Sequence, residues 1–261
     1  MSVERYHYKD HVILAEIDPD PMNSRKEFDN AGTMVCWHSR YDLGDKHDWS
    51  SAEDFLKGLA CEVDPSVDTR IDWWENTGFV NHSSEFVDEK VKEIIQKALD
   101  KHVIMLECYL YDHSGITMNT SGFSCDWDSG QVGFIYISRK NAVKEWGKKL
   151  CTKKVVELAK KYLKGEVETY DQYLTGQVYG KRVLGPLEAG HTDEDDDPKD
   201  EEWDDEREEI DSCWGYFGSD MTDEDGDMVK EAKSTIDWHI KDNEEKAIQE
   251  AVAVSSNGAG I

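Results

Sequence analysis

The sequence is poor in basic residues and contains no long apolar run. Its 261 residues include 30 Lys and Arg against 57 Asp and Glu, which gives a formal net charge of −27. Lys and Arg provide most of the attraction to nucleic acid phosphates and anionic lipids, so we expect no direct binding to DNA, RNA or a membrane surface. No apolar stretch approaches the roughly 20 residues that cross a bilayer, and Met1–Lys9 does not resemble a signal peptide.

The six cysteines form no CxxC pair, and no histidine pair accompanies them at zinc-site spacing. They are scattered through apolar segments, which predicts buried free thiols in a reducing cytoplasm. His38 and His47 flank a turn with three nearby carboxylates, of Asp42, Asp45 and Asp48. Isolated histidines at a strand end are more often structural groups than metal ligands. We therefore expect neither a metal nor a cofactor.

The apolar and aromatic stretch Lys101–Arg139 predicts the centre of a folded domain. It divides into three expected strands, 103–111, 116–120 and 131–138, separated by two polar turns. Residues 88–102 precede it with the apolar spacing of an amphipathic helix. The sequence therefore predicts an α+β fold: a mostly antiparallel sheet, with a central meander at about 103–138, and amphipathic helices packed on it.

Further elements are expected on both sides of this centre. Apolar runs predict strands at 11–17 and 33–41, a hairpin over 166–184, and helices over 152–164 and 228–252. Ser50–Glu53 is typical of a capping box, and 64–82, with Trp73 and Trp74, is expected to be irregular. We expect one α+β domain formed by 1–190 and 210–254, an inserted, mobile acidic loop at 191–209, and a disordered tail at 255–261.

Polar residues in the two central turns are the candidates for catalysis. His113 and Ser114 lie in the first turn, and Cys125, Asp126, Asp128 and Gln131 lie in or beside the second. In a meander the two turns lie at opposite ends of a middle strand of about 16 Å. A cysteine–histidine pair needs hydrogen-bond contact, so it requires the second connection to fold back along the sheet. Turn formation by Asp128, Ser129 and Gly130 is the simpler interpretation.

Acidic residues are concentrated in 191–227, which contains 19 Asp and Glu against Lys199 and Arg207. Like charges at this density cannot form a core, so the run is expected at the surface. It is the best candidate for binding a basic partner, with Trp203 as a possible anchor. The candidate partner-binding residues are Asp193, Glu194, Asp195, Asp196, Asp197, Asp200, Glu201, Glu202, Trp203, Asp204, Asp205 and Glu206.

Several segments resemble a group of uncharacterised proteins encoded by phages and mobile elements. The resemblance is carried by YDHSGITMNTSGFSCDWDSGQVGFIY at 111–136, GEVETYDQYLTGQVYG at 165–180, DSCWGYFG at 211–218, and the segments 32–36 and 41–45. It covers most of the chain except the acidic run and the two ends. The group has no assigned reaction, so the resemblance implies no catalytic residues. It implies a phage or mobile-element setting, in which the cytoplasm would be that of the host cell.

Three functions are compatible with these features. The first is an acidic accessory protein, of anti-defence or anti-CRISPR type, that inhibits a basic host protein such as a defence nuclease by imitating nucleic acid. The second is a hydrolase-type enzyme with its site on the turns at 112–114 and 125–131. The third is a virion or assembly accessory protein without catalysis. We favour the first over an enzyme because no known catalytic spacing appears in the central turns.

Overall fold

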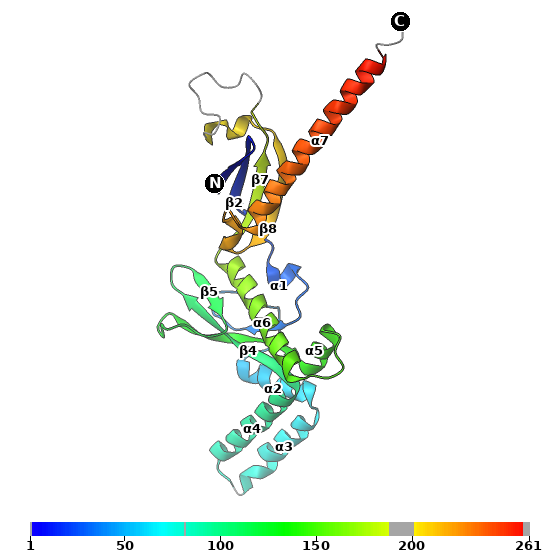
Figure 1. The fold of residues 1–261 in the computed structure, drawn as a ribbon. Helices are drawn as coiled ribbons and strands as arrows, with labels where there is room; N and C mark the ends of the chain where they lie inside the picture. Colours follow the sequence, from blue (N-terminus) through cyan, green and yellow to red (C-terminus); the bar gives the residue numbers. More distant parts are fainter. Residues whose placement is uncertain (1, 81, 188–200, 258–261) are drawn as a thin grey trace. The chain divides into compact units, whose positions relative to one another are not determined.

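The computed structural model describes residues 2–80, 82–187 and 201–257 (Figure 1). The sequence predicts one domain, whereas the contacts within the chain group it into two compact units. Unit 1 comprises residues 1–22 and 176–261, and unit 2 comprises residues 23–175. Unit 2 is thus an insertion between β2 (His11–Ile17) and β7 (Val178–Leu184), which pair with each other. Within the described residues, no helix has the length and apolarity needed to cross a membrane.

Unit 1 is an antiparallel sheet of strand order β1-β2-β7-β8 with one long helix against it. β1 (Ser2–Tyr8) lies in a segment that the sequence analysis left without a strand, and β8 (Glu209–Phe217) follows the acidic run. Helix α7 (Asp227–Asn257) buries Met228, Val229, Ala232 and Ile236 against one face of the sheet. The short 3-10 helices η2 (Glu201–Glu206) and η3 (Ser219–Thr222) complete the unit. Helix α7 includes residues 255–257 of the expected disordered tail, and 258–261 lie outside the described residues.

Unit 2 contains a second antiparallel sheet, so the predicted α+β class is confirmed. Its strands are β3 (Thr33–Cys36), β4 (Val103–Asp112), β5 (Ile116–Asn119) and β6 (Ser129–Ser138), in the order β3-β6-β4-β5. The predicted meander is therefore wrong, because β4 rather than β5 is the middle strand of the three. β6 returns along the far side of β4, where its apolar residues join the buried cluster under the helices. This order places the two polar turns at the same end of the sheet.

Helices cover both faces of the sheet in unit 2. One face packs on α6 (Lys153–Leu174), and the other packs on α2 (Ala52–Val63), α3 (Ser66–Thr77) and α4 (Ser84–His102). The shorter elements are α1 (Ser24–Glu27), η1 (Gly78–Val80) and α5 (Arg139–Glu145).

Three local predictions about these helices are wrong. Residues 166–174 continue α6, because Val167 and Tyr170 extend the buried stripe of Leu163 beyond Gly165. Trp73 and Trp74 belong to α3, whose buried Val67 and Ile71 anchor it. The cap of α2 is Ser51, which accepts a hydrogen bond from the amide of Asp54, one residue later than the predicted capping box.

Candidate functional site

The turn residues proposed for catalysis are brought together by the strand order. The amide of Asp112 donates a hydrogen bond to the carbonyl of Asp128, with a length of 2.8 Å. His113 Nδ1 lies 3.2 Å from Asp128 Oδ2, and Cys125 Sγ lies 3.9 Å from the same oxygen. The expected separation of the two turns along a middle strand is therefore wrong, since β4 runs beside both β5 and β6.

The geometry of this cluster is that of a turn rather than of a nucleophilic site. His113 and Cys125 both contact the same oxygen of Asp128, and no hydrogen bond joins the two side chains to each other within the described residues. Activated cysteines lie beside cationic groups, whereas the polar partner of this thiol is a carboxylate. The side chain of His113 is 64% exposed, and Ser114 and Asp126 are exposed as well. Gln131 is exposed and donates only a long, 3.5 Å hydrogen bond to the carbonyl of Gly133.

The acidic run is fixed at its C-terminal end. Asp193, Glu194, Asp195, Asp196, Asp197 and Asp200 lie outside the described residues, as does most of the expected mobile loop. The remaining candidates form η2. Asp204 accepts two hydrogen bonds from Arg5, at 3.0 Å from Nε and 2.7 Å from Nη2. The guanidinium of Arg207 is buried and donates to the carbonyls of Gly185, at 2.7 Å, and Asp10, at 3.1 Å.

These contacts divide the candidate residues into two groups. Asp204 is occupied by Arg5, and Trp203 is half-buried with a buried indole N–H. Asp204 is therefore used within the protein, whereas the indole N–H of Trp203 has no hydrogen-bond partner among the described residues, and the role of Trp203 as an anchor stays a prediction. Glu201 and Asp205 are exposed, and Glu208 beyond the helix is also exposed. Unit 1 as a whole contains 31 of the 57 acidic residues but 10 of the 30 Lys and Arg.

Besides Arg207, two cations are buried that were not predicted to be so. In unit 2, the side chain of Arg25 is 1% exposed and donates to both oxygens of Asp45, to Glu166 and to the carbonyl of Gly32, at 2.8–2.9 Å. Burial alone would lower the pKa of Arg25, but hydrogen bonds to the Asp45 and Glu166 carboxylates outweigh it and raise the pKa. The carboxylates in turn accept the amides of Met34 and Ala31. This network joins α1, β3 and α6, and its role is structural.

In unit 1, Lys181 is fully buried under α7. Its Nζ lies 3.0 Å from Glu231 Oε1 and 3.4 Å from Asp211 Oδ2, and the hydroxyl of Tyr216 donates to the other oxygen of Glu231. The hydrogen bond from Lys181 lowers the pKa of the Glu231 carboxyl. The sequence contains a signal that Lys181 is buried. Lys181 alternates with Tyr179 and Val183 on the inward side of a strand, where a lysine needs a partner.

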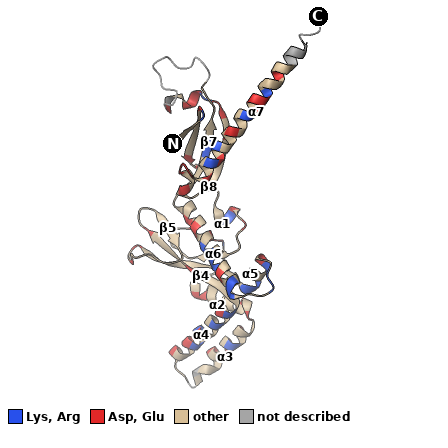
Figure 2. Cartoon of the chain, in the orientation of Figure 1, with Lys and Arg blue, Asp and Glu red and all other residues tan. Residues whose placement is uncertain are grey.

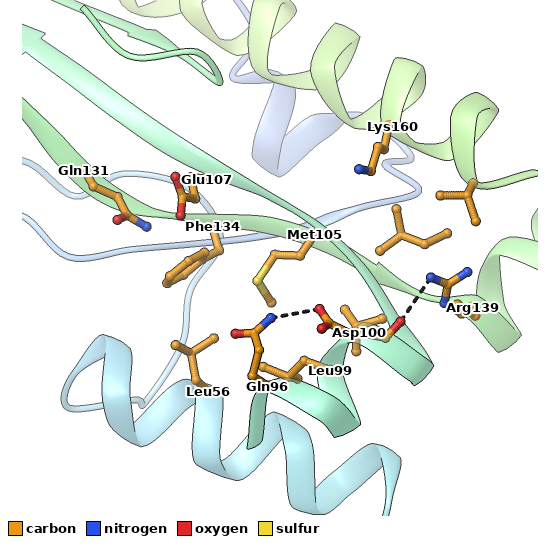
Figure 3. A pocket seen from close by; sticks show the side chains of 13 residues that line it. Leu56, Gln96, Leu99, Asp100, Met105, Glu107, Gln131, Phe134, Arg139 and Lys160 are labelled. Atoms are coloured by element: carbon orange, nitrogen blue, oxygen red, sulfur yellow. Dashed lines mark hydrogen bonds between the residues drawn. The ribbon is translucent and has the colours of Figure 1, made fainter. Parts of the chain in front are cut away.

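A groove of about 410 Å³ in unit 2 was also missed (Figure 3). Leu99 of α4, Met105 of β4, Phe134 of β6 and Val156 of α6 supply apolar surface, and Arg139 and Lys160 supply positive charge. Apolar walls with a few polar groups are typical of binding sites. No short sequence motif indicates this groove, because its residues come from six separate elements.

The turn with His38 and His47 does not assemble a metal centre. His47 Nε2 lies 2.9 Å from the carbonyl oxygen of Cys36, and His38 stacks on Tyr41. Over residues 2–80, 82–187 and 201–257, no group of three or more His, Cys, Asp or Glu side chains is placed to hold a metal ion.

Comparison with known proteins adds no further constraint. No family model, curated protein or solved structure matches the chain. The functional proposal therefore rests on the geometry and charge of the chain's own residues and on the resemblance of its segments described above.

Thiol labelling of the native protein is expected to divide the six free cysteines by exposure. Burial raises the pKa of the Cys108 thiol to about 12 and also raises that of Cys36, so neither forms appreciable thiolate near neutral pH. Cys213 is exposed. A disulfide reagent should modify Cys213 in the folded chain, and Cys36 and Cys108 only after unfolding, as located by peptide mass spectrometry. Rapid labelling of Cys108 in the native chain would contradict this assignment.

Proposed function

We propose that the chain is an acidic accessory protein that binds the nucleic-acid-binding surface of a basic partner and blocks it. The observation that supports this function is the anchored acidic segment of unit 1. Arg5 and Arg207 fix the backbone around η2, while Glu201, Asp205 and Glu208 remain exposed. A fixed row of carboxylates loses less conformational entropy on binding than a free acidic tail does.

A basic groove that binds phosphates is the natural complement of such a segment, because charge complementarity favours both the rate and the specificity of association. The resemblance to phage and mobile-element proteins makes a host defence nuclease the class of partner that we propose. The turn cluster does not favour the hydrolase alternative, since its histidine and cysteine contact one shared carboxylate rather than each other.

Neutralising the acidic run is expected to weaken partner binding by tenfold or more, because each lost carboxylate removes attraction to a basic surface. The variant replaces Asp193, Glu194, Glu201, Asp205 and Glu208 by their amides and keeps Asp204 and Arg207, which hold η2. Basic nucleic-acid-binding proteins are first captured from host lysate. Fluorescence anisotropy then measures whether the chain competes with labelled DNA for binding to these proteins. The inhibition should also weaken as salt rises.

The matched control neutralises five exposed acidic residues of unit 2, namely Glu62, Asp68, Asp72, Glu85 and Glu89. It removes the same formal charge and should retain inhibition within about twofold, since long-range attraction is screened beyond about 10 Å at 0.1 M salt. Equal inhibition by the acidic-run variant and the unmodified chain would exclude the proposed function. Equal losses in both variants would show that only the net charge matters, which also contradicts an anchored recognition segment.

A further inference from the structure

Strand β4 is paired along its whole length on one side only. β6 pairs with Val103–Tyr111, whereas β5 pairs on the other side from Tyr109 to Asp112. In the described part of unit 2, no strand pairs with Val103–Cys108 on the β5 side. The chain leaves the line of β5 after Asn119, whose side chain accepts hydrogen bonds from the amides of Ser121 and Gly122 and so turns the backbone away. An open strand edge presents backbone donors and acceptors that can pair with another extended chain.

The groove of Figure 3 follows this open edge. Val103, Ile104, Met105 and Glu107 line it, so residues from both faces of β4 contribute to one depression. One wall is formed by α2 and α4, through side chains that include Leu56 and Leu99, and the other by Val156 and Lys160 of α6. Six residues of extended chain span about 20 Å, which is the length of the unpaired stretch. The walls place apolar surface on both sides of a chain that would lie along β4.

The groove is lined by two basic side chains, of Arg139 and Lys160, and by two acidic ones, of Asp100 and Glu107. Arg139 donates to the carbonyl of Asp100, at 3.1 Å, and to Cys151 Sγ, at 3.7 Å, but its buried Nε has no hydrogen-bond partner. Neither Arg139 nor Lys160 has a carboxylate within ion-pair distance among the described residues. The two groove carboxylates are already hydrogen-bonded, Asp100 by Gln96 and Glu107 by Tyr109.

The surroundings are basic as well. Residues 139–164 contain 10 Lys and Arg against Glu145 and Glu157, and Figure 2 shows these bases gathered on α5 and the first half of α6. The excess of basic residues in this region contrasts with the net charge of −27 of the whole chain. A partly buried guanidinium without a counterion favours an anionic ligand, because burial of an uncompensated charge is costly.

We propose that unit 2 binds an extended acidic peptide, which adds as a strand to the open edge of β4 and places a carboxylate beside Arg139 and Lys160. Backbone pairing with Val103–Cys108 supplies affinity, alternate side chains enter the apolar walls, and the carboxylate selects the partner. This site is independent of the acidic segment of unit 1, so either proposal can fail while the other holds.

The test is a selection of random nine-residue peptides displayed on phage against the purified full-length chain. Enriched peptides should carry an acidic residue at one end and alternate apolar residues, as strand addition requires. Their affinities, measured by fluorescence anisotropy, should fall tenfold or more in Lys160→Gln and in Arg139→Gln. Lys160 is exposed, so its variant tests the charge without disturbing the fold. The control Lys161→Gln changes a neighbouring base that does not line the groove and should stay within about twofold.

Strand addition has a second signature. Methylating the peptide amides that face β4 should abolish binding, and methylating the alternate amides should not, because only one set pairs with a neighbouring strand. Three results would overturn the proposal: no enriched peptide, affinities unchanged by both groove variants, or equal tolerance of methylation at every amide. Enriched peptides that bind as helices would overturn it as well.

Discussion

Replacing Arg25 by methionine is expected to lower the free energy of unfolding of unit 2 by about 3–5 kcal/mol. The substitution keeps much of the apolar stem but removes every donor to Asp45, Glu166 and the carbonyl of Gly32. Glu166 and Asp45 have side chains that are 13% and 24% exposed, so both would be left as poorly solvated charges without a cation. The cost arises mainly from these unpaired groups rather than from the lost attraction itself.

Urea denaturation is monitored by hydrogen exchange of peptides from unit 2. This readout separates the unfolding of unit 2 from that of unit 1. Arg25→Lys should recover only part of the loss, because an ammonium cannot make the paired contacts of a guanidinium. Arg40→Met is the control. Arg40 pairs with Asp112, but its side chain is 66% exposed, so the change should cost at most about 1 kcal/mol. Similar losses in both methionine variants would show that the buried network has no special role.

Gly133→Ala is expected to destabilise unit 2 by about 3 kcal/mol or more, near the upper end for overpacking. Gly133 lies on β6 between Cys36 of β3 and Cys108 of β4. A Cβ added there would lie 2.1 Å from the carbonyl oxygen of Val35 and 2.8 Å from the Cα of Cys36. Both neighbours are backbone atoms of a paired strand, so the clash can be relieved only by moving β3 away from β6.

Gly130→Ala provides the control on the same strand. A Cβ at Gly130 meets no atom within 4 Å, so alanine should be neutral or add about 0.4–1 kcal/mol by restricting the unfolded chain. The free energies of both variants are measured by urea denaturation, and hydrogen exchange of β3 peptides tests the proposed displacement. The close approach of β3 and β6 would be contradicted if Gly133→Ala kept full stability and the exchange rate of β3 amides did not change.

Local patterns in the sequence predicted the elements better than their arrangement. The apolar spacing from Val91 to Leu99 predicted α4, because one buried stripe determines an amphipathic helix regardless of its neighbours. The order of β4, β5 and β6 was not predictable in this way. A connection of nine residues reaches either side of β4, and the choice depends on which apolar side chains α6 covers. That choice alone decides whether His113 meets Asp128.

The same limit applies to the acidic segment and the groove. Charge density predicted that 191–209 would not form a core, but η2 is fixed by Arg5, which lies 199 residues from Asp204 in the sequence. From the sequence alone, Arg139 and Lys160 are expected to be ordinary surface bases. Only the strand order shows that they line a groove at the open edge of β4. Charge patterns therefore led to the partner that we propose for unit 1, whereas the groove of unit 2 depends on long-range pairing that no local pattern contains.

The insertion of unit 2 between β2 and β7 bears on how the chain folds as it leaves the ribosome. Residues 23–175 are complete before Val178 is synthesised, so unit 2 can fold while β1 and β2 still lack the neighbour that β7 provides. At roughly 5–20 residues per second, the nascent hairpin waits on the order of 10 s or more for that neighbour. The β2 edge lacks its β7 neighbour throughout this delay. Folding of unit 2, once residue 175 has been made, then brings residues 23 and 175 into one compact body, after which β7 can pair with β2.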